Sequence, residues 1–458
     1  MTHCTITSAP GKVLLTGGYL VLEQAFSGSV VGTSSRFYTV IQSSSEPNHI
    51  SVRSPQFEQA HWEYQVLDTL ELKPLTLENN NKFVETALQV TLQLIQDKHV
   101  LKSGLDIIIV GDNDFYSQRA QLQAQGLLNT AESLASLEPF CFTHATLASV
   151  HKTGLGSSAA LITSLVAGLL LYFGRIEDVT SDENKRWIHN TAQFVHCFAQ
   201  GKVGSGFDVS SAVWGSHRYT RFNPDILKPM MNNLNTSIES LICQEWDNQV
   251  VPFSLPIGFD LVLADIDAGS HTPTLVSKVL EWKKKMPEQA NALWKELGKY
   301  NTSVENHFRS LVNLHHQNPK EYEETLKACG SLQCNDWSSE NKVAAELKSL
   351  AHDFNQVRSL LRKMGEYSDV PIEPQEQTEL LDACMQVPGV IMAGVPGAGG
   401  YDAIFCIVLS EESKTQVRQV WKSWTKLSVG PLLSQADSNG ITRPLFDQVP
   451  GLSRFISK

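Results

Sequence analysis

The sequence predicts an α+β fold divided into two domains, and three observations lead to this prediction. With 458 residues the chain is too long for one ordinary hydrophobic core. Its first part reads as short apolar runs separated by turn residues, which is typical of a sheet. Its second half holds a long zone with apolar residues at helical spacing, set between further strand candidates.

The first part of the chain contributes most of the expected strands. Each candidate is a short apolar run, bounded by residues that favour turns. The candidate strands are 13–15, 29–31, 37–41, 50–52, 105–110 and 145–150. Residues 83–97 instead carry apolar side chains at helical spacing and predict a helix.

The stretch from His151 to Leu161 reads HKTGLGSSAAL and leads into an apolar helix candidate, 159–173. Two glycines in this loop allow the backbone to approach an anion closely, and the helix that follows points its free N–H groups toward the loop. Ser157 and Ser158 stand where a hydroxyl can cap the helix, bind phosphate or reach a metal ion. A plain strand-to-helix turn with a serine cap is the alternative.

Downstream, a helix is expected over 181–200, followed by a second glycine-rich loop, GKVGSGFD, that ends at Asp208. Residues 209–214 continue as a short helix or strand. The next residues are turn-rich and basic, and we expect the domain boundary there. The predicted domains are therefore 1–220 and 221–458.

The second half starts from a strand candidate, 259–266. Thr272-Pro273 then has the form of a helix start, and helical spacing continues to Met364 with breaks near 317–319 and at Gly330. A further helix is expected over 373–384. The remaining strand candidates, 390–393 and 403–409, flank a third glycine-rich loop, GVPGAGGYD.

Composition excludes several classes of protein. The chain has 42% hydrophobic and 19% charged residues and a net charge of -11, which argues against nucleic-acid or anionic-membrane partners. Its eight cysteines are scattered without a CxxC pair, so neither a zinc site nor a disulfide framework is expected. No signal sequence is visible and the longest apolar run is too short to cross a bilayer, so we expect a cytoplasmic protein.

The motifs also exclude the two commonest nucleotide folds. No GxxxxGK[ST] sequence is present, and no loop has the GxGxxG spacing of a Rossmann fold. Instead a Pro-Gly-Lys loop at Lys12, the Gly-Leu-Gly-Ser-Ser-Ala loop and the late Gly-Ala-Gly-Gly loop follow in that order. This order resembles the GHMP small-molecule kinases. Further segments, such as 111–118, 201–208, 264–273 and 357–364, are similar to the fungal and plant members whose acceptor is phosphomevalonate.

The resemblance implies ATP-dependent phosphorylation of (R)-5-phosphomevalonate in the mevalonate route to isoprenoids, with Mg²⁺ as the second cofactor. It implies a two-domain GHMP kinase fold with the ATP and substrate cleft between the domains. The C-terminal domain would be ferredoxin-like, with a helical insertion. The oligomeric state, monomer or homodimer, stays open.

The resemblance also assigns residues. ATP-binding residues would be Lys152, Thr153, Gly154, Leu155, Gly156, Ser157, Ser158 and Ala159. Mevalonate-kinase-like members carry a magnesium-binding glutamate on the helix before the aspartate loop, but here that stretch, 193–200, has no carboxylate. Ser158 is therefore the predicted metal ligand, and His196 is expected to be a hydrogen-bonded helix residue.

Charge decides the expected chemistry. A phosphate acceptor is already mostly dianionic at pH 7, so cations are needed more than a general base. We expect Lys12 to bridge the donor and acceptor phosphates, with Lys202 as a second catalytic cation and Lys152 beside the loop. Asp208 matches the family's catalytic aspartate and is expected to orient Lys12 or the acceptor.

The acceptor pocket follows from resemblance alone. Its expected residues are Lys12, Tyr116, Ser117, Ser205, Gly206, Thr272, Arg358, Gly397, Ala398 and Gly399. Two alternatives stay open: a related kinase with an alcohol acceptor, such as mevalonate kinase, and a non-catalytic relative that binds a ligand as a sensor.

Overall fold

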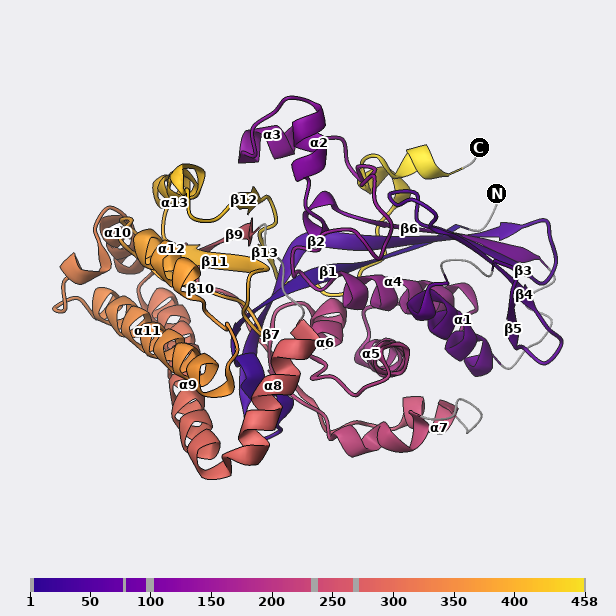
Figure 1. Cartoon of the computed structure of the whole chain (residues 1–458), viewed down its shortest axis with the longest axis horizontal. Coiled ribbons are helices and arrows are strands. Elements are labelled where there is room, and N and C mark those ends of the chain that lie inside the picture. The colour runs from indigo at the N-terminus through magenta and orange to yellow at the C-terminus, as the bar shows by residue number, and fades with distance from the viewer. Residues whose placement is uncertain (1–3, 77–79, 96–102, 232–237, 267–271, 457–458) are drawn as a thin grey trace.

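A computed structural model of the chain describes residues 4–76, 80–95, 103–231, 238–266 and 272–456. It contains a nine-stranded sheet at one end and a four-stranded sheet with a layer of long helices at the other (Figure 1). This mixed architecture confirms the predicted α+β class. No helix of the described residues is long and apolar enough to cross a membrane.

The large sheet is built on two long antiparallel strands, β1 and β2, which pair along almost their whole length. The strand order is β5-β4-β3-β6-β2-β7-β8, and both β1 and β13 also pair with β2. The strands are β1 Cys4–Thr16, β2 Ser27–Ser44, β3 His49–Arg53, β4 His61–Val66, β5 Leu72–Pro74, β6 Gly104–Gly111, β7 His217–Thr220, β8 Gln249–Pro252 and β13 Ala436–Asp437. The two strands predicted at 29–31 and 37–41 are therefore parts of one strand, β2.

Helices cover one face of this sheet (Figure 1). They are α1 Lys82–Leu94, α4 Ser157–Tyr172, α5 Asp182–Gln200, α6 Phe207–Trp214 and α7 Ile238–Cys243. The central helix, α4, is apolar on nearly every side because it lies between β1 and β2 on one side and α1 and α5 on the other. Thr7 and Thr39 of the sheet fix it by hydrogen bonds to Ser164.

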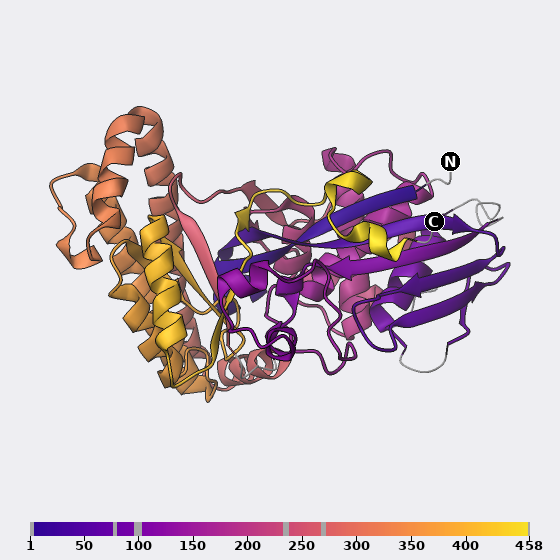
Figure 2. The ribbon, with the colours of Figure 1, turned by 90° about the horizontal axis from the view of Figure 1, so that it is seen from above.

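The opposite face of the large sheet is covered by the end of the chain. Val449 and Leu452 pack against Val40 and Ile108 of the sheet. Figure 2 shows this C-terminal segment running back from the small-sheet end along the large sheet. Two short helices, α2 Arg119–Ala124 and α3 Ala131–Ala135, lie on the same side in Figure 1.

The small sheet has the strand order β10-β11-β9-β12. Its members are β9 Asp260–Ile266, β10 Val390–Gly394, β11 Ala403–Val408 and β12 Val429–Leu432. Helices connect β9 to β10, and α13 Glu411–Ser423 connects β11 to β12. This is the β-α-β-β-α-β order of a ferredoxin-like domain, as expected.

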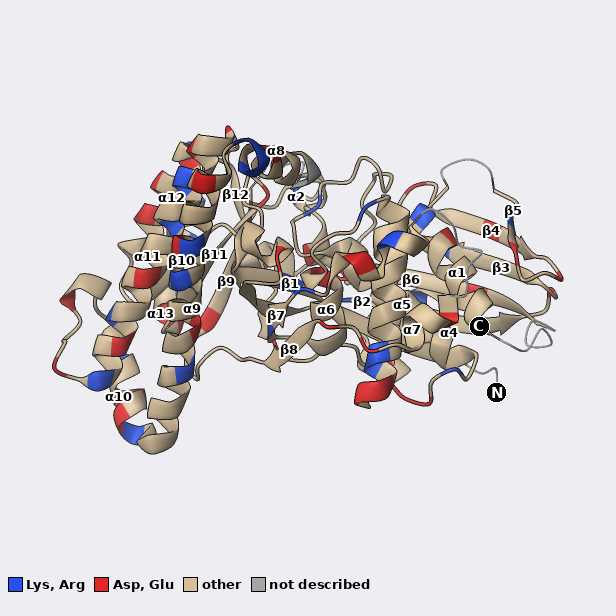
Figure 3. Cartoon of the chain, turned by 90° about the horizontal axis from the view of Figure 1, so that it is seen from below, with Lys and Arg blue, Asp and Glu red and all other residues tan. Residues whose placement is uncertain are grey.

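The connection between β9 and β10 is enlarged into a helical layer. It holds α8 Thr272–Lys285, α9 Pro287–Gln317, α10 Pro319–Gly330, α11 Lys342–Ser368 and α12 Gln375–Met385. The breaks predicted near 317–319 and at Gly330 are present, since Pro319 opens α10 and Gly330 closes it. Acidic and basic residues are interspersed over α9 to α12 (Figure 3), which is typical of a solvated layer.

The structure corrects one local prediction and decides another. The strand predicted at 145–150 is wrong: the stretch forms turns, because Thr146 and Ser149 bond to each other and to the local backbone. The segment 209–214, for which a strand was the alternative, is helical as part of α6. The boundary at residue 220 stays a prediction, although β8 and β13 join the large sheet from beyond it.

Candidate active site

The loop that precedes α4 is bonded to β1 and to the turn that follows β6. The Lys12 N–H donates to the Leu155 carbonyl at 2.9 Å, and the Thr153 N–H donates to the Phe115 carbonyl at 3.2 Å. Gly154 and Gly156 have φ of 78° and 82°, which only glycine adopts without strain. The loop is therefore held rigidly while its outer edge stays exposed.

The start of α4 is suited to bind an anion. Gly156 is the residue before the helix, and no side chain caps the first turn. The first N–H groups of the helix and the positive end of its dipole therefore have no internal acceptor. Ser157 and Ser158 stand directly at this point and line a cavity.

Lys12 lies against the loop. Its Nζ donates to the Gly154 carbonyl at 2.8 Å, and the chain can lie this close because a Cβ on Gly156 would stand only 3.1 Å from the lysine. Burial lowers the pKa of Lys12, and the carboxylates of Asp208 and Asp402 oppose that shift. The site thus contains a poorly solvated cation with carboxylates near it.

Asp208 lies in the first turn of α6 and is linked to the start of α4. His196 on α5 mediates this link, with its Nε2 3.9 Å from the Asp208 Oδ2 and 3.1 Å from the Ser158 Oγ. Gln200 also bonds to that nitrogen, at 2.9 Å. Burial lowers the pKa of His196, although Asp208 opposes the shift. His196 is therefore a hydrogen-bonded helix residue, as expected.

Two cavities meet at the loop. The first, of 420 Å³, is lined by Lys152, Ser157 and Ser158 together with aromatic residues such as Trp62. The second, of 160 Å³, is lined by Lys12 and Gly154. Because residues of the loop line two different cavities, a donor and an acceptor of phosphate can each reach the loop from a cavity of its own.

The structure brings half of the predicted site residues to these cavities. The residues that line them are Lys12, Tyr116, Lys152, Gly154, Ser157, Ser158, Ser205, Gly397, Ala398 and Gly399. Others support the loops: Thr153, Leu155 and Ala159 are buried, Gly206 precedes α6, and Ser117 bonds through its N–H to the His151 carbonyl. Thr272 begins α8, but its side chain lies outside the described part of the chain.

Lys202 and Arg358 line neither of these two cavities. Lys202 is exposed and follows the C-terminal end of α5, where its N–H donates to the Cys197 carbonyl. Arg358 is buried and forms ion pairs with Glu373 at 2.7 Å and Asp382 at 2.9 Å. Burial by itself would lower the pKa of Arg358, but these two carboxylates outweigh it and raise that pKa.

Arg358 nevertheless supports the acceptor cavity from behind. Its partner Glu373 follows Ile372, whose carbonyl accepts the Gly400 N–H at 2.9 Å. Gly399 packs so closely on the same carbonyl that a Cβ there would stand 2.0 Å from it. The buried ion cluster therefore fixes the strand-to-strand loop that lines the cavity.

Several residues were missed by the sequence reasoning. Asp402, Phe207 and Tyr19 line the cavity of Lys12, and the Tyr19 hydroxyl donates to the Ala398 carbonyl at 2.8 Å. Trp62 and Phe83 line the larger cavity. Asp402 could have been found, since it ends its glycine-rich loop as Asp208 ends the earlier one. The aromatic residues carry no signal in the sequence because they come from distant elements.

Comparison with known proteins shows which family the chain belongs to. Residues 343–427 match the family model described as GHMP kinases C terminal. The chain is 38% identical to the peroxisomal phosphomevalonate kinase of Arabidopsis thaliana, covering 95% of each chain. It is 36% identical to the phosphomevalonate kinase of Candida albicans, covering 88% of this chain and 89% of that one.

A solved structure shows the same fold. The phosphomevalonate kinase of Streptococcus pneumoniae, in complex with phosphomevalonate and AMPPNP, matches with a TM-score of 0.59 over 95% of this chain and 100% of that one. The sequence identity is 13%, so this likeness concerns the fold alone.

Proposed function

The chain belongs to the phosphomevalonate kinases of the GHMP kinase family, and we propose that it transfers the γ-phosphate of ATP to the phosphate of (R)-5-phosphomevalonate. The products are ADP and (R)-5-diphosphomevalonate, in the mevalonate route to isoprenoids and sterols. The observation that carries this proposal is the pair of cavities meeting at the loop, with the Lys12 Nζ bonded to the Gly154 carbonyl.

The larger cavity would hold the nucleotide. Trp62, Phe83 and Leu161 give it an apolar wall suited to a base, and Asn81 and Lys82 supply polar groups. Its other end reaches Ser157 and Ser158 at the start of α4. ATP would therefore place its phosphates on the free N–H groups of the helix and its nucleoside in the aromatic part.

The smaller cavity would hold the acceptor phosphate. Lys12 enters it, and Ser205, Gly397 and Ala398 line it. The acceptor is dianionic at pH 7, so its oxygen attacks without a base and the obstacle is repulsion between two anions. Lys12 would reduce that repulsion by standing between them, and Asp208 would keep Lys12 charged and oriented.

Mg²⁺ would be held mainly by phosphate oxygens. Among the described residues, no group of three His, Cys, Asp or Glu side chains could hold a metal ion. Ser158 fits as a single protein ligand, because its Oγ is oriented by His196 and can direct a lone pair to the phosphate site. When bound, Mg²⁺ neutralises part of the ATP charge.

Coupled measurement of ADP release tests the proposal. Turnover is expected with phosphomevalonate and not with mevalonate or galactose at equal concentration. Lys12→Met serves as the control for contaminating kinases, since its preparation should show no turnover. Turnover with mevalonate alone would contradict the proposal and favour an alcohol acceptor.

We also propose that the protein is cytoplasmic and that it is either a monomer or a homodimer. The large sheet, the small sheet and both cavities are formed within one chain, which supports a site that needs no second copy. Light scattering during size exclusion checks the assembly state, and a fluorescent fusion checks the location against the peroxisome that is named for the Arabidopsis relative.

A further inference from the structure

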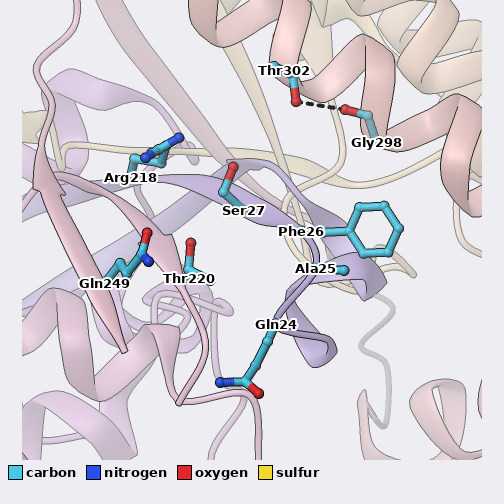
Figure 4. A pocket seen from close by; sticks show the side chains of 9 residues that line it. All are labelled: Gln24, Ala25, Phe26, Ser27, Arg218, Thr220, Gln249, Gly298 and Thr302. Carbon is cyan, nitrogen blue, oxygen red and sulfur yellow. Dashed lines mark hydrogen bonds between the residues drawn. The ribbon is translucent and has the colours of Figure 1, made fainter. Parts of the chain in front are cut away.

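A third cavity, of 290 Å³, lies between the large sheet and α9 (Figure 4). Its wall is a row of polar residues on three neighbouring strands. Ser27 of β2 pairs with Thr220 of β7, and Thr220 pairs with Gln249 of β8. Arg218 precedes Thr220 by two residues and therefore points to the same face of the sheet. Figure 4 shows these four side chains gathered around one space.

The polar groups of this row have unused hydrogen-bonding capacity. Among the residues drawn in Figure 4, the hydroxyls of Ser27 and Thr220 and the amide of Gln249 form no hydrogen bond to one another or to another lining residue. The Nε of Arg218 is buried and likewise has no hydrogen-bond partner there. Polar groups that converge in this way are satisfied by whatever enters the cavity.

Arg218 is the one charged residue among the described residues that line the cavity. Arg218 contacts Glu305 of α9, with 3.5 Å between its Nε and the Glu305 Oε1. The same carboxylate also pairs with Arg309, so two guanidinium groups share one negative charge. None of the described residues that line the cavity is acidic.

We propose that this cavity binds a small oxyanion of the phosphate type, supplied either as inorganic phosphate or as the phosphate of a small ester. Two hydroxyls, one amide and one guanidinium are all hydrogen-bond donors, and they match the oxygen atoms of such an anion. The volume admits a phosphate or a short ester but is smaller than either a whole nucleotide or the 420 Å³ cavity of the active site.

This site differs from the two cavities of the active site in its residues but lies close to one of them in the chain. Gly18, Tyr19, Val21 and Leu22 line the acceptor cavity, and residues 24–27 line the proposed anion site. An anion bound here would connect β2 and β7 of the large sheet to α9 of the helical layer. It would therefore fix the junction of the two parts without touching the reacting groups.

Titration with inorganic phosphate at constant ionic strength tests the proposal. The variant Ser27→Ala/Thr220→Val removes two donors with almost no change of shape, and we expect it to weaken one class of phosphate binding about tenfold or more. Thr325→Val, which removes a hydroxyl from α10 that bonds to the Glu321 carbonyl, is the matched control and should leave binding unchanged. Turnover in phosphate-free buffer should be the same for the wild type, for Ser27→Ala/Thr220→Val and for Thr325→Val.

Arg218→Gln gives an independent variant, because Glu305 keeps Arg309 as its partner. It should weaken the same class of binding. Glycerol 3-phosphate, titrated in parallel, separates the two sources: tighter binding of the ester indicates a metabolite, and tighter binding of inorganic phosphate indicates the free ion. Equal phosphate affinity in wild type and both variants overturns the proposal.

Selenate, an oxyanion with anomalous scattering, locates the site in a soaked crystal. A peak within hydrogen-bonding distance of Ser27 and Thr220 is expected. A selenate peak at the start of α4 shows that the soak succeeded. If that peak is present and the third cavity holds no selenate peak, the proposal is also overturned. Neither result depends on the identity of the phosphate acceptor, so the outcome is separate from that of the proposed activity.

Discussion

The cavity wall at Lys12 and the ion cluster at Arg358 each contain a cation that is at least half-buried. The two regions differ in how fully nearby carboxylates balance the charge of that cation. Lys12 bonds to a carbonyl, and burial lowers its pKa although Asp208 and Asp402 oppose that shift. Arg358 makes close ion pairs with Glu373 and Asp382, which raise its pKa. An under-compensated cation at a cavity attracts an anion, whereas a fully paired one holds elements together. From this comparison we propose that Lys12 acts on the substrate and that Arg358 supports the site.

The largest expected effect is on turnover at Lys12. Lys12→Met should lower kcat by about 10³-fold or more, because one preorganised cation between two phosphates is lost. The free energy of unfolding should stay the same or rise, since a poorly solvated charge is removed. Steady-state kinetics and urea unfolding measure the two quantities. A large loss of stability with little change of kcat would place Lys12 with the supporting residues.

At Arg358 the effect should fall on stability. Arg358→Met leaves Glu373 buried with one partner fewer, and we expect a loss of about 3–5 kcal/mol in the free energy of unfolding. Urea unfolding measures this loss. Arg358→Met/Glu373→Met should recover most of it, because no buried charge is then left without its ion pair. Failure of the double variant to recover stability would show that Arg358 acts through packing instead.

The two cations should also differ in pH dependence. Lys12 must carry its proton to attract phosphate, and its lowered pKa means that this proton is lost at a lower pH than in an ordinary lysine. The rate should therefore fall about tenfold per pH unit as the pH rises through that pKa, which lies below 10.5. A pH profile of kcat/KM measures this limb. Lys12→Arg should remove the limb, since arginine keeps its charge; an unchanged limb would assign it to another group.

The smallest effects concern two glycines of the loop that Arg358 supports. Gly399→Ala would place a Cβ 2.0 Å from the Ile372 carbonyl, so we expect a loss of about 1–3 kcal/mol and a raised KM for the acceptor. At Gly397 an added Cβ would have no described atom within 4 Å, and only the φ of 65° disfavours alanine. We therefore expect Gly397→Ala to lower the free energy of unfolding by about 1 kcal/mol. Thermal unfolding and acceptor titration compare the two variants. If both variants lose the same stability, the close packing of Gly399 on Ile372 is unimportant.

Much of the fold could be predicted from local sequence. The glycine-rich loops, the helix that follows Ser157 and Ser158, the break near 317–319 and several apolar strands were predicted, whereas β4, β5, β7, β8, β12 and β13 were not. Residues 145–150 were wrongly predicted as a strand. Their apolar run has the length of a strand, and nothing in it indicates the turn that Thr146 and Ser149 stabilise. The joining of two predicted strands into β2 was also hidden, since polar residues between them are buried only by neighbouring strands.

The candidate site divides in the same way. Lys12, Ser158 and the glycine loops were named from motifs, and they line the cavities. Asp402 and the aromatic wall at Trp62 were not named, because no local pattern connects them to the loop. Arg358 was named for the acceptor, and the structure instead surrounds it with carboxylates.

The sequence by itself determined where backbone must approach an anion, because that requirement is met locally by glycines followed at once by a helix. Only the tertiary structure decided which of the three candidate lysines line the cavities: Lys12 and Lys152 do, whereas Lys202 does not. Lys12 meets Gly154 across 142 positions of the chain and lies near Asp402 from the opposite end. The balance of charge around a side chain depends on such distant neighbours, and no local pattern contains it.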